Sequence, residues 1–147
     1  MADLPDIERL AIQQACYDLA VDYAEICDSR DWPRFREIFT EDAVFGLARG
    51  GPMLRGLDNI IAAFTARPAT GVTQHFITNI RVRVESLTAA SGSARVLLYT
   101  APDAAPDSPE GRAAAPKQIM GVYKDRYVRT SAGWRFAERI GTLTLHT

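Results

Sequence analysis

An aspartate and a histidine, far apart in the sequence, are the two residues whose types could together move a proton. Asp28 ends a long apolar segment near the N-terminus, and His75 lies in a later segment that reads as a strand. A carboxylate at the end of an apolar row is poorly solvated, and a histidine is the obvious group to pair with it. Inside a closed apolar pocket, such a pair can take a proton from a bound molecule.

The segment that carries Asp28 is predicted to be one long helix over residues 5–29. Polar side chains recur at spacings of three and four, which marks a solvent-facing stripe on a mostly apolar cylinder: Asp18, Asp22, Glu25 and Ser29. On an ideal helix Tyr17, Val21, Ala24 and Asp28 share one row, so Asp28 is expected to end a buried line. Tyr23 lies about 140° around the helix from Asp28. Both reach one pocket only if the helix crosses its mouth or loosens at its end.

The rest of the chain indicates an α+β fold. Asp31 before Trp-Pro is typical of a helix N-cap and opens a short helix to about Phe39. A short strand over 43–47 and a helix over 58–66 follow. From Gly71 onward the pattern has a period of two and predicts antiparallel strands at 73–86, 91–101, 116–130 and 133–146. Long strands curl, and a curled sheet closed by helices encloses a pocket.

Composition narrows the class of protein. The 147 residues suit a single domain over 1–147, and a net charge of −1 gives no electrostatic footprint for nucleic acid. No apolar run approaches the ~20 residues that span a membrane, and the acidic N-terminus is unlike a targeting signal, so we expect a cytoplasmic protein. Cys16 and Cys27 would lie ~16 Å apart on the helix, as reduced core residues.

Composition and motif content also bear on a long loop and on metal binding. Residues 101–116 are rich in Pro and Ala and predict a long loop, either filler or a lid. The sequence has no clustered His/Cys ligand pattern, so no metal site is predicted.

Several short motifs, taken in order, resemble the SnoaL-like branch of the nuclear-transport-factor-like superfamily. The resemblance covers nearly the whole chain. The residues that carry it are Asp28-Ser-Arg-Asp-Trp32, Phe39-Thr-Glu-Asp-Ala-Val44, Gly56 before the predicted helix over 58–66, Thr73-Gln-His75, Gly121-Val-Tyr-Lys-Asp125 and Gly133-Trp-Arg-Phe136. The resemblance implies a cone-shaped α+β barrel, in which N-terminal helices pack on a strongly curved antiparallel sheet around a pocket. Locally, the motifs at Asp28 and His75 are most similar to those of scytalone dehydratases. Bile-acid dehydratases and lindane dehydrochlorinases share the Asp and His at similar separation.

Carried onto this sequence, the resemblance implies a cofactor-independent, dehydratase-type lyase that acts on a small cyclic or polycyclic hydrophobic molecule. His75 would be the base, Asp28 would orient it, and Tyr23 would polarise a substrate oxygen. Asn79, Tyr123 and Tyr17 are the expected substrate contacts, with core packing the alternative for Tyr17. The resemblance also implies a homodimer or homotrimer.

Other readings remain open at this stage. Cys27 replaces the tyrosine that precedes the aspartate in scytalone dehydratases, so scytalone itself is not the expected substrate. The same pair could serve an isomerase or cyclase, or the chain could be a non-catalytic ligand-binding or accessory subunit similar to dioxygenase β subunits. Alternation alone places His75 with Arg81 and Arg83 on the wetter strand face. A curved strand that faces the pocket at one end and solvent at the other would reconcile the two.

Overall fold

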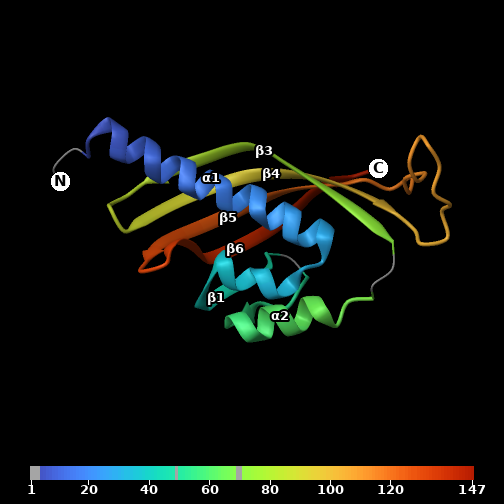
Figure 1. The fold of residues 1–147 in the computed structure, drawn as a ribbon, viewed down its shortest axis with the longest axis horizontal. Helices are drawn as coiled ribbons and strands as arrows, with labels where there is room; N and C mark the ends of the chain where they lie inside the picture. Colours follow the sequence, from blue (N-terminus) through green and yellow to red (C-terminus); the bar gives the residue numbers. More distant parts are fainter. Residues whose placement is uncertain (1–3, 49, 69–70) are drawn as a thin grey trace.

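One long helix lies across the face of a six-stranded sheet in the computed structural model, which describes residues 4–48, 50–68 and 71–147 (Figure 1). This helix, α1, spans Asp6–Ser29 and ends at Arg30, whose backbone is left-handed (φ 57°). A 3-10 helix, η1 (Trp32–Glu37), follows, and α2 (Leu57–Thr65) packs against β1 and η1. The predicted N-terminal helix is therefore confirmed to within one residue.

The sheet is curved and unclosed. Its strands run in the order β2-β1-β6-β5-β4-β3. Their bounds are β1 Phe39–Leu47, β2 Leu54–Arg55, β3 Val72–Val84, β4 Ala89–Ala101, β5 Ile119–Thr130 and β6 Gly133–His146. All neighbouring strands pair antiparallel except β1 and β6, which run parallel to each other. The α+β class and the helix-covered, curved sheet agree with the prediction, and the parallel pair is a departure from it.

Some local predictions need correction. The short helix after Asp31 is a 3-10 helix, and the Asp31 side chain makes no capping hydrogen bond. The strand predicted over 43–47 begins earlier, at Phe39, and the two-residue strand β2 was not predicted. Short elements carry too few residues for their period to be read, so tertiary pairing decides where they begin.

The helix α1 buries one face and exposes the other. Its buried residues are Ile12, Cys16, Leu19, Ala20, Tyr23, Ala24, Ile26 and Cys27. Tyr17 is 45% exposed and Val21 37% exposed, so the expected buried row from Tyr17 to Asp28 is wrong over its first half. The solvent-facing arc is broader than its polar residues indicate, because apolar side chains at its border tolerate exposure.

A bulge in β3 explains why His75 faces the interior although Arg81 and Arg83, also odd-numbered, face solvent. The pairing of β3 with β4 shifts between Thr78 and Arg81, and Asn79 has a positive φ of 51°. Asparagine is one of the few residues that adopt this conformation readily. Before the bulge, Thr73 and His75 face inward, whereas after it Arg81 and Arg83 are exposed. The alternation argument that put His75 on the wetter face is therefore wrong.

Candidate active site

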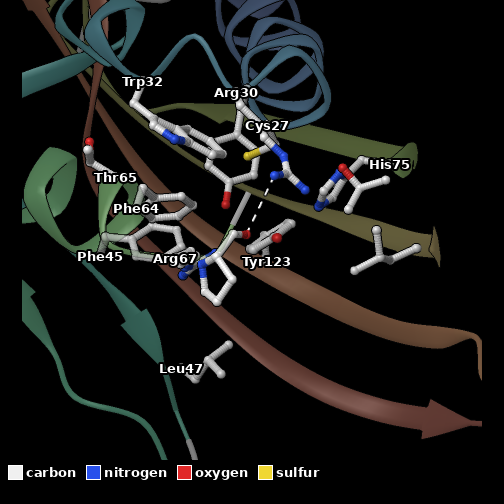
Figure 2. Close-up of a pocket in the computed structure, with 14 residues that line it drawn as sticks. Cys27, Arg30, Trp32, Phe45, Leu47, Phe64, Thr65, Arg67, His75 and Tyr123 are labelled. Carbon is white, nitrogen blue, oxygen red and sulfur yellow. Dashed lines mark hydrogen bonds between the residues drawn. The ribbon is translucent and has the colours of Figure 1, made fainter. Parts of the chain in front are cut away.

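A cavity of about 550 Å³ lies between the C-terminal end of α1, α2 and the inner face of the sheet. Figure 2 shows the side chains around it. The wall is mostly apolar and aromatic, with a few polar groups, and it is formed by Tyr23, Cys27, Arg30, Trp32, Phe45, Leu47, Phe64, Thr65, Arg67, Pro68, Thr73, His75, Leu98 and Tyr123. Pockets of this size and character are typical of small-molecule sites.

The Asp28 carboxylate is held by three hydrogen bonds from β3. Its Oδ1 accepts from the Thr73 hydroxyl at 2.9 Å and lies 2.6 Å from Nδ1 of His75, and its Oδ2 accepts from the His75 backbone N–H at 2.9 Å. These bonds tie the last turn of α1 to the strand. They also supply the stabilisation that a carboxylate at a helix C-terminus otherwise lacks.

This contact fixes which nitrogen of His75 is available for chemistry. A carboxylate only accepts hydrogen bonds, so Nδ1 carries the proton that points at Asp28. The second nitrogen, Nε2, is then the lone-pair nitrogen of the neutral ring. The His75 side chain is 12% exposed and lines the cavity, and the Asp28 side chain is 23% exposed behind it. In chemical terms, an imidazole and a carboxylate arranged in this way are able to act as a general base and the acid that orients it.

Two tyrosines and a cysteine form the polar part of the cavity floor. Tyr23 and Tyr123 pack edge to face with ring centroids 5.6 Å apart, and their hydroxyl groups interact. Burial raises the pKa of both phenols, so each stays protonated and can donate a hydrogen bond near neutral pH. Burial likewise raises the pKa of the Cys27 thiol to about 12, so Cys27 is an inert thiol at this pH.

A buried ion pair lies beneath this floor. The Arg139 guanidinium is fully buried, packs 4.4 Å from the Tyr23 ring centroid and 4.1 Å from that of Tyr123, and pairs with Asp125 at 3.2 Å. The Tyr127 hydroxyl donates to the same carboxylate at 3.1 Å. Burial raises the pKa of Asp125, and the charge of Arg139 partly opposes that effect. The pair fixes the rings that form the cavity floor.

Breaking this pair should destabilise the fold strongly. Asp125→Asn leaves the buried Arg139 charge without a counter-charge, which is expected to lower the free energy of unfolding by about 3–5 kcal/mol. Urea denaturation of the variant and the wild type measures the difference. Asp107→Asn is the matched control, because it breaks the exposed pair of Asp107 with Arg112 and should change stability little. Equal, small losses in both variants would contradict the structural role of Asp125.

The structure brings together some of the sequence-predicted site residues and separates others. Asp28, His75, Tyr23 and Tyr123 meet at the cavity, with Tyr23 in its floor and Asp28 behind His75. Tyr17 and Asn79 do not line it: Tyr17 lies on the exposed face of α1, and the Asn79 side chain is exposed at the bulge of β3. The prediction that these two contact substrate is therefore not supported by their positions.

Sequence reasoning missed several residues of the site. Arg30 and Arg67 line the cavity, and Thr73 binds Asp28, although only its place in a motif had been noted. Arg139 was missed because an arginine in a strand normally indicates an exposed face. A bulge between β5 and β6 shifts the register between Arg126 and Tyr127 and places Arg139 inside. Its sequence neighbours, Glu138 and Ile140, give no local signal of burial.

Three remaining expectations concern the loop, metals and membranes. The connection between β4 and β5 contributes no residue to the cavity wall, so in this conformation it is not a lid over the site. Within the ranges that the structure describes, no three His, Cys, Asp or Glu side chains are grouped so that they could hold a metal ion. None of the described helices has the length and apolar character needed to cross a membrane.

The chain belongs to the SnoaL-like domain family, whose model matches residues 8–140. Proteins of Mycobacterium tuberculosis (Rv2910c) and Mycobacterium bovis (Mb2934c), both called uncharacterized, are each 32% identical to it over 145 residues, covering 92% of this chain and 84% of theirs. The family assignment agrees with the resemblance seen in the motifs around Asp28 and His75.

Solved structures with the same fold include elimination enzymes. A hexachlorocyclohexane dehydrochlorinase, LinA type 2, is similar with a TM-score of 0.80 and 26% identity, covering 97% of this chain and 92% of its own. The type 3 LinA of Novosphingobium barchaimii has a TM-score of 0.79 and 25% identity, over 97% and 93% of the two chains. A scytalone dehydratase-like protein of Novosphingobium aromaticivorans has a TM-score of 0.79 at 21% identity, over 97% and 91%, which indicates the fold alone.

Proposed function

We propose that the protein is a cofactor-independent lyase that removes water from a small cyclic or polycyclic hydroxylated molecule. The observation that carries this proposal is the 2.6 Å contact of Asp28 with Nδ1 of His75, which leaves Nε2 at the wall of an apolar cavity. The similarity to dehydrochlorinases, whose name describes an elimination, supports the same class of reaction.

The proposed reaction needs proton transfers only. Nε2 of His75 takes a proton from a carbon next to a carbonyl group, and the electron pair of that C–H bond forms a carbon–carbon double bond. The hydroxyl group on the neighbouring carbon leaves with the electrons of its C–O bond and takes the proton from the His75 imidazolium, which forms water and restores the neutral ring. Asp28 stabilises the imidazolium that forms, and Tyr23, together with Tyr123, donates a hydrogen bond to a substrate oxygen.

A β-hydroxyketone with two fused rings provides a direct test. Loss of water from 3-hydroxy-1-tetralone gives 1-naphthol, which is fluorescent, so elimination can be followed continuously. We expect the wild type to accelerate this reaction, and we expect the C2 protons to exchange with D2O when followed by NMR. Exchange without elimination would favour an isomerase or cyclase with the same base. Absence of both would refute the lyase and leave a binding or accessory role.

We also propose that the chain self-associates through the outer face of the sheet. Cross-strand pairing places Phe76, Leu97, Met120 and Leu145 in one row over four strands, and Phe76 is 52% and Leu145 64% exposed. An apolar row of this kind on an exposed face favours an interface. Phe76→Glu should shift the mass in sedimentation velocity from a dimer or trimer to a monomer. A monomeric wild type would refute the proposal.

A further inference from the structure

The charges around the cavity are unusually one-sided. Among the residues that the structure describes, Arg30 and Arg67 form part of its wall, and no carboxylate side chain does. The nearby Asp28 carboxylate is occupied by its bonds from Thr73 and His75. The cavity wall is therefore positive, and a low-dielectric wall strengthens the attraction for a negative ligand.

Arg67 is held in an orientation that suits anion binding. Its guanidinium carbon lies 3.7 Å from the centroid of the Phe64 ring, which is 1% exposed and cannot move aside. Stacking uses the flat face of a guanidinium and leaves its N–H edge for bonds in the plane. Arg67 is exposed at the rim, makes no ion pair within the ranges described, and its charge lowers the pKa of the Cys27 thiol against the larger effect of burial. Its charge therefore acts on the cavity.

Arg30 adds to the same field from a fixed position. Its guanidinium donates to the backbone carbonyls of Gly71 at 2.8 Å and Pro68 at 3.5 Å, the second of which is the dashed line in Figure 2. These bonds tie the end of α1 to the segment before β3 and hold a cation at the cavity wall. The remaining wall is mostly apolar and aromatic, with Trp32, Phe45 and Leu98 among its residues.

We propose that the substrate carries an anionic group, a carboxylate or a phosphate monoester, which Arg67 binds at the rim while an apolar ring system enters the cavity. The inference rests on the proposed function for the use of this cavity as the substrate site. Neither a neutral hydrocarbon nor a cation can accept hydrogen bonds from the N–H edge of the Arg67 guanidinium. A planar carboxylate accepts two parallel hydrogen bonds from a guanidinium, and a phosphate monoester offers oxygens at similar spacing.

Binding of three naphthalene probes tests the proposal without turnover. 2-Naphthoate, 2-naphthamide and 2-naphthyl phosphate share one ring system and differ in charge and head group. By calorimetry at low salt we expect one or both anions to bind at least about fivefold more tightly than the amide, the size of a partly exposed charge-assisted bond. The anion that binds more tightly shows whether the site prefers a carboxylate or a phosphate monoester. The preference should shrink as salt is raised.

Variants assign the preference to Arg67. Arg67→Gln should remove the anion preference and leave the affinity for 2-naphthamide within about twofold, whereas Arg67→Lys should retain part of it. Arg126→Gln is the matched control, because Arg126 is exposed on β5 outside the cavity wall. The His75 ring signals, assigned with the His146→Gln variant, should shift when 2-naphthoate is added.

Three results would overturn the proposal. They are failure of both anions to bind, equal affinity of anion and amide for the wild type, and an anion preference that survives in Arg67→Gln. The His75→Gln variant separates this inference from the lyase. This variant lacks the proposed base but keeps Arg67, so it should still prefer the anions. If it does, and the wild type does not accelerate loss of water, the lyase proposal alone is refuted. The reverse pattern, with elimination but no anion preference, would refute this inference alone.

Discussion

Replacing His75 with glutamine is expected to lower the rate of 1-naphthol formation from 3-hydroxy-1-tetralone by about 10²–10⁴-fold, because a positioned general base contributes that much. Glutamine is similar in length and can still reach the Asp28 carboxylate through its amide N–H, so the variant should fold. It has no basic nitrogen to accept the substrate proton. Continuous fluorescence at saturating substrate measures the change in kcat.

His146→Gln is the matched control for this variant, since His146 is the other histidine of the sequence and lies exposed at the end of β6. Its rate should equal that of the wild type. A His75→Gln rate within threefold of wild type, with thermal unfolding unchanged, would contradict the role of His75 as the base.

Asp28→Asn is expected to reduce kcat by a similar factor for a different reason. An asparagine oxygen can accept one or two of the present bonds, but its NH2 group must then face the Thr73 hydroxyl or a His75 N–H, all of which are donors in the wild type. Nδ1 of His75 then loses its charged acceptor, and the ring favours the tautomer whose Nε2 carries the proton. Loss of the correct tautomer in a comparable pair lowers kcat by about 10⁴.

The same substitution should also be visible in stability. The carboxylate joins α1 to β3, and removing one charged acceptor from partly buried donors is expected to cost about 1–3 kcal/mol in urea denaturation. Glu25→Gln, on the exposed face of α1, removes one carboxylate from the same helix and should change neither quantity appreciably. An Asp28→Asn variant with wild-type kcat would contradict the orienting role, whatever its stability.

The main elements of the fold could be predicted from the sequence because they are long and strongly periodic. The helix α1 and the strands β3 to β6 each extend over twelve residues or more, so one misplaced residue does not hide the period. The parallel pairing of β1 with β6 was not predictable in this way. It depends on where the chain returns in space, which a local pattern does not encode.

The site was less predictable, and two bulges explain much of the difference. His75 and Arg81 have the same parity in β3 yet face opposite sides, because the bulge at Asn79 lies between them. Arg139 is inside for the analogous reason in β6. A bulge adds one residue and inverts all later alternation, so a strict period of two gives the wrong face beyond it. The motif resemblance, which does not depend on parity, identified His75 correctly as a cavity residue.

Helix α1 illustrates the opposite kind of error. Its polar residues marked the centre of the exposed face but not its width, so Tyr17 was placed on the buried side. At about 100° per residue, an ideal helix puts Tyr23 about 140° around the axis from Asp28, which argued against one shared pocket. In the structure Tyr23 is 2% exposed in the cavity floor, and Asp28 reaches the same region through β3. The helix therefore places Tyr23 in the cavity wall and Asp28 behind His75, which lines it.

The protonation of the His75 ring is the most direct test of the central claim. A long-range ¹H–¹⁵N spectrum at a pH where the ring is neutral distinguishes the two nitrogens by chemical shift. If His75 is a base oriented by Asp28, Nδ1 should resonate as a protonated nitrogen and Nε2 as an unprotonated one, and Asp28→Asn should abolish this pattern. Averaged shifts for both nitrogens, or a proton on Nε2 in the wild type, would contradict it.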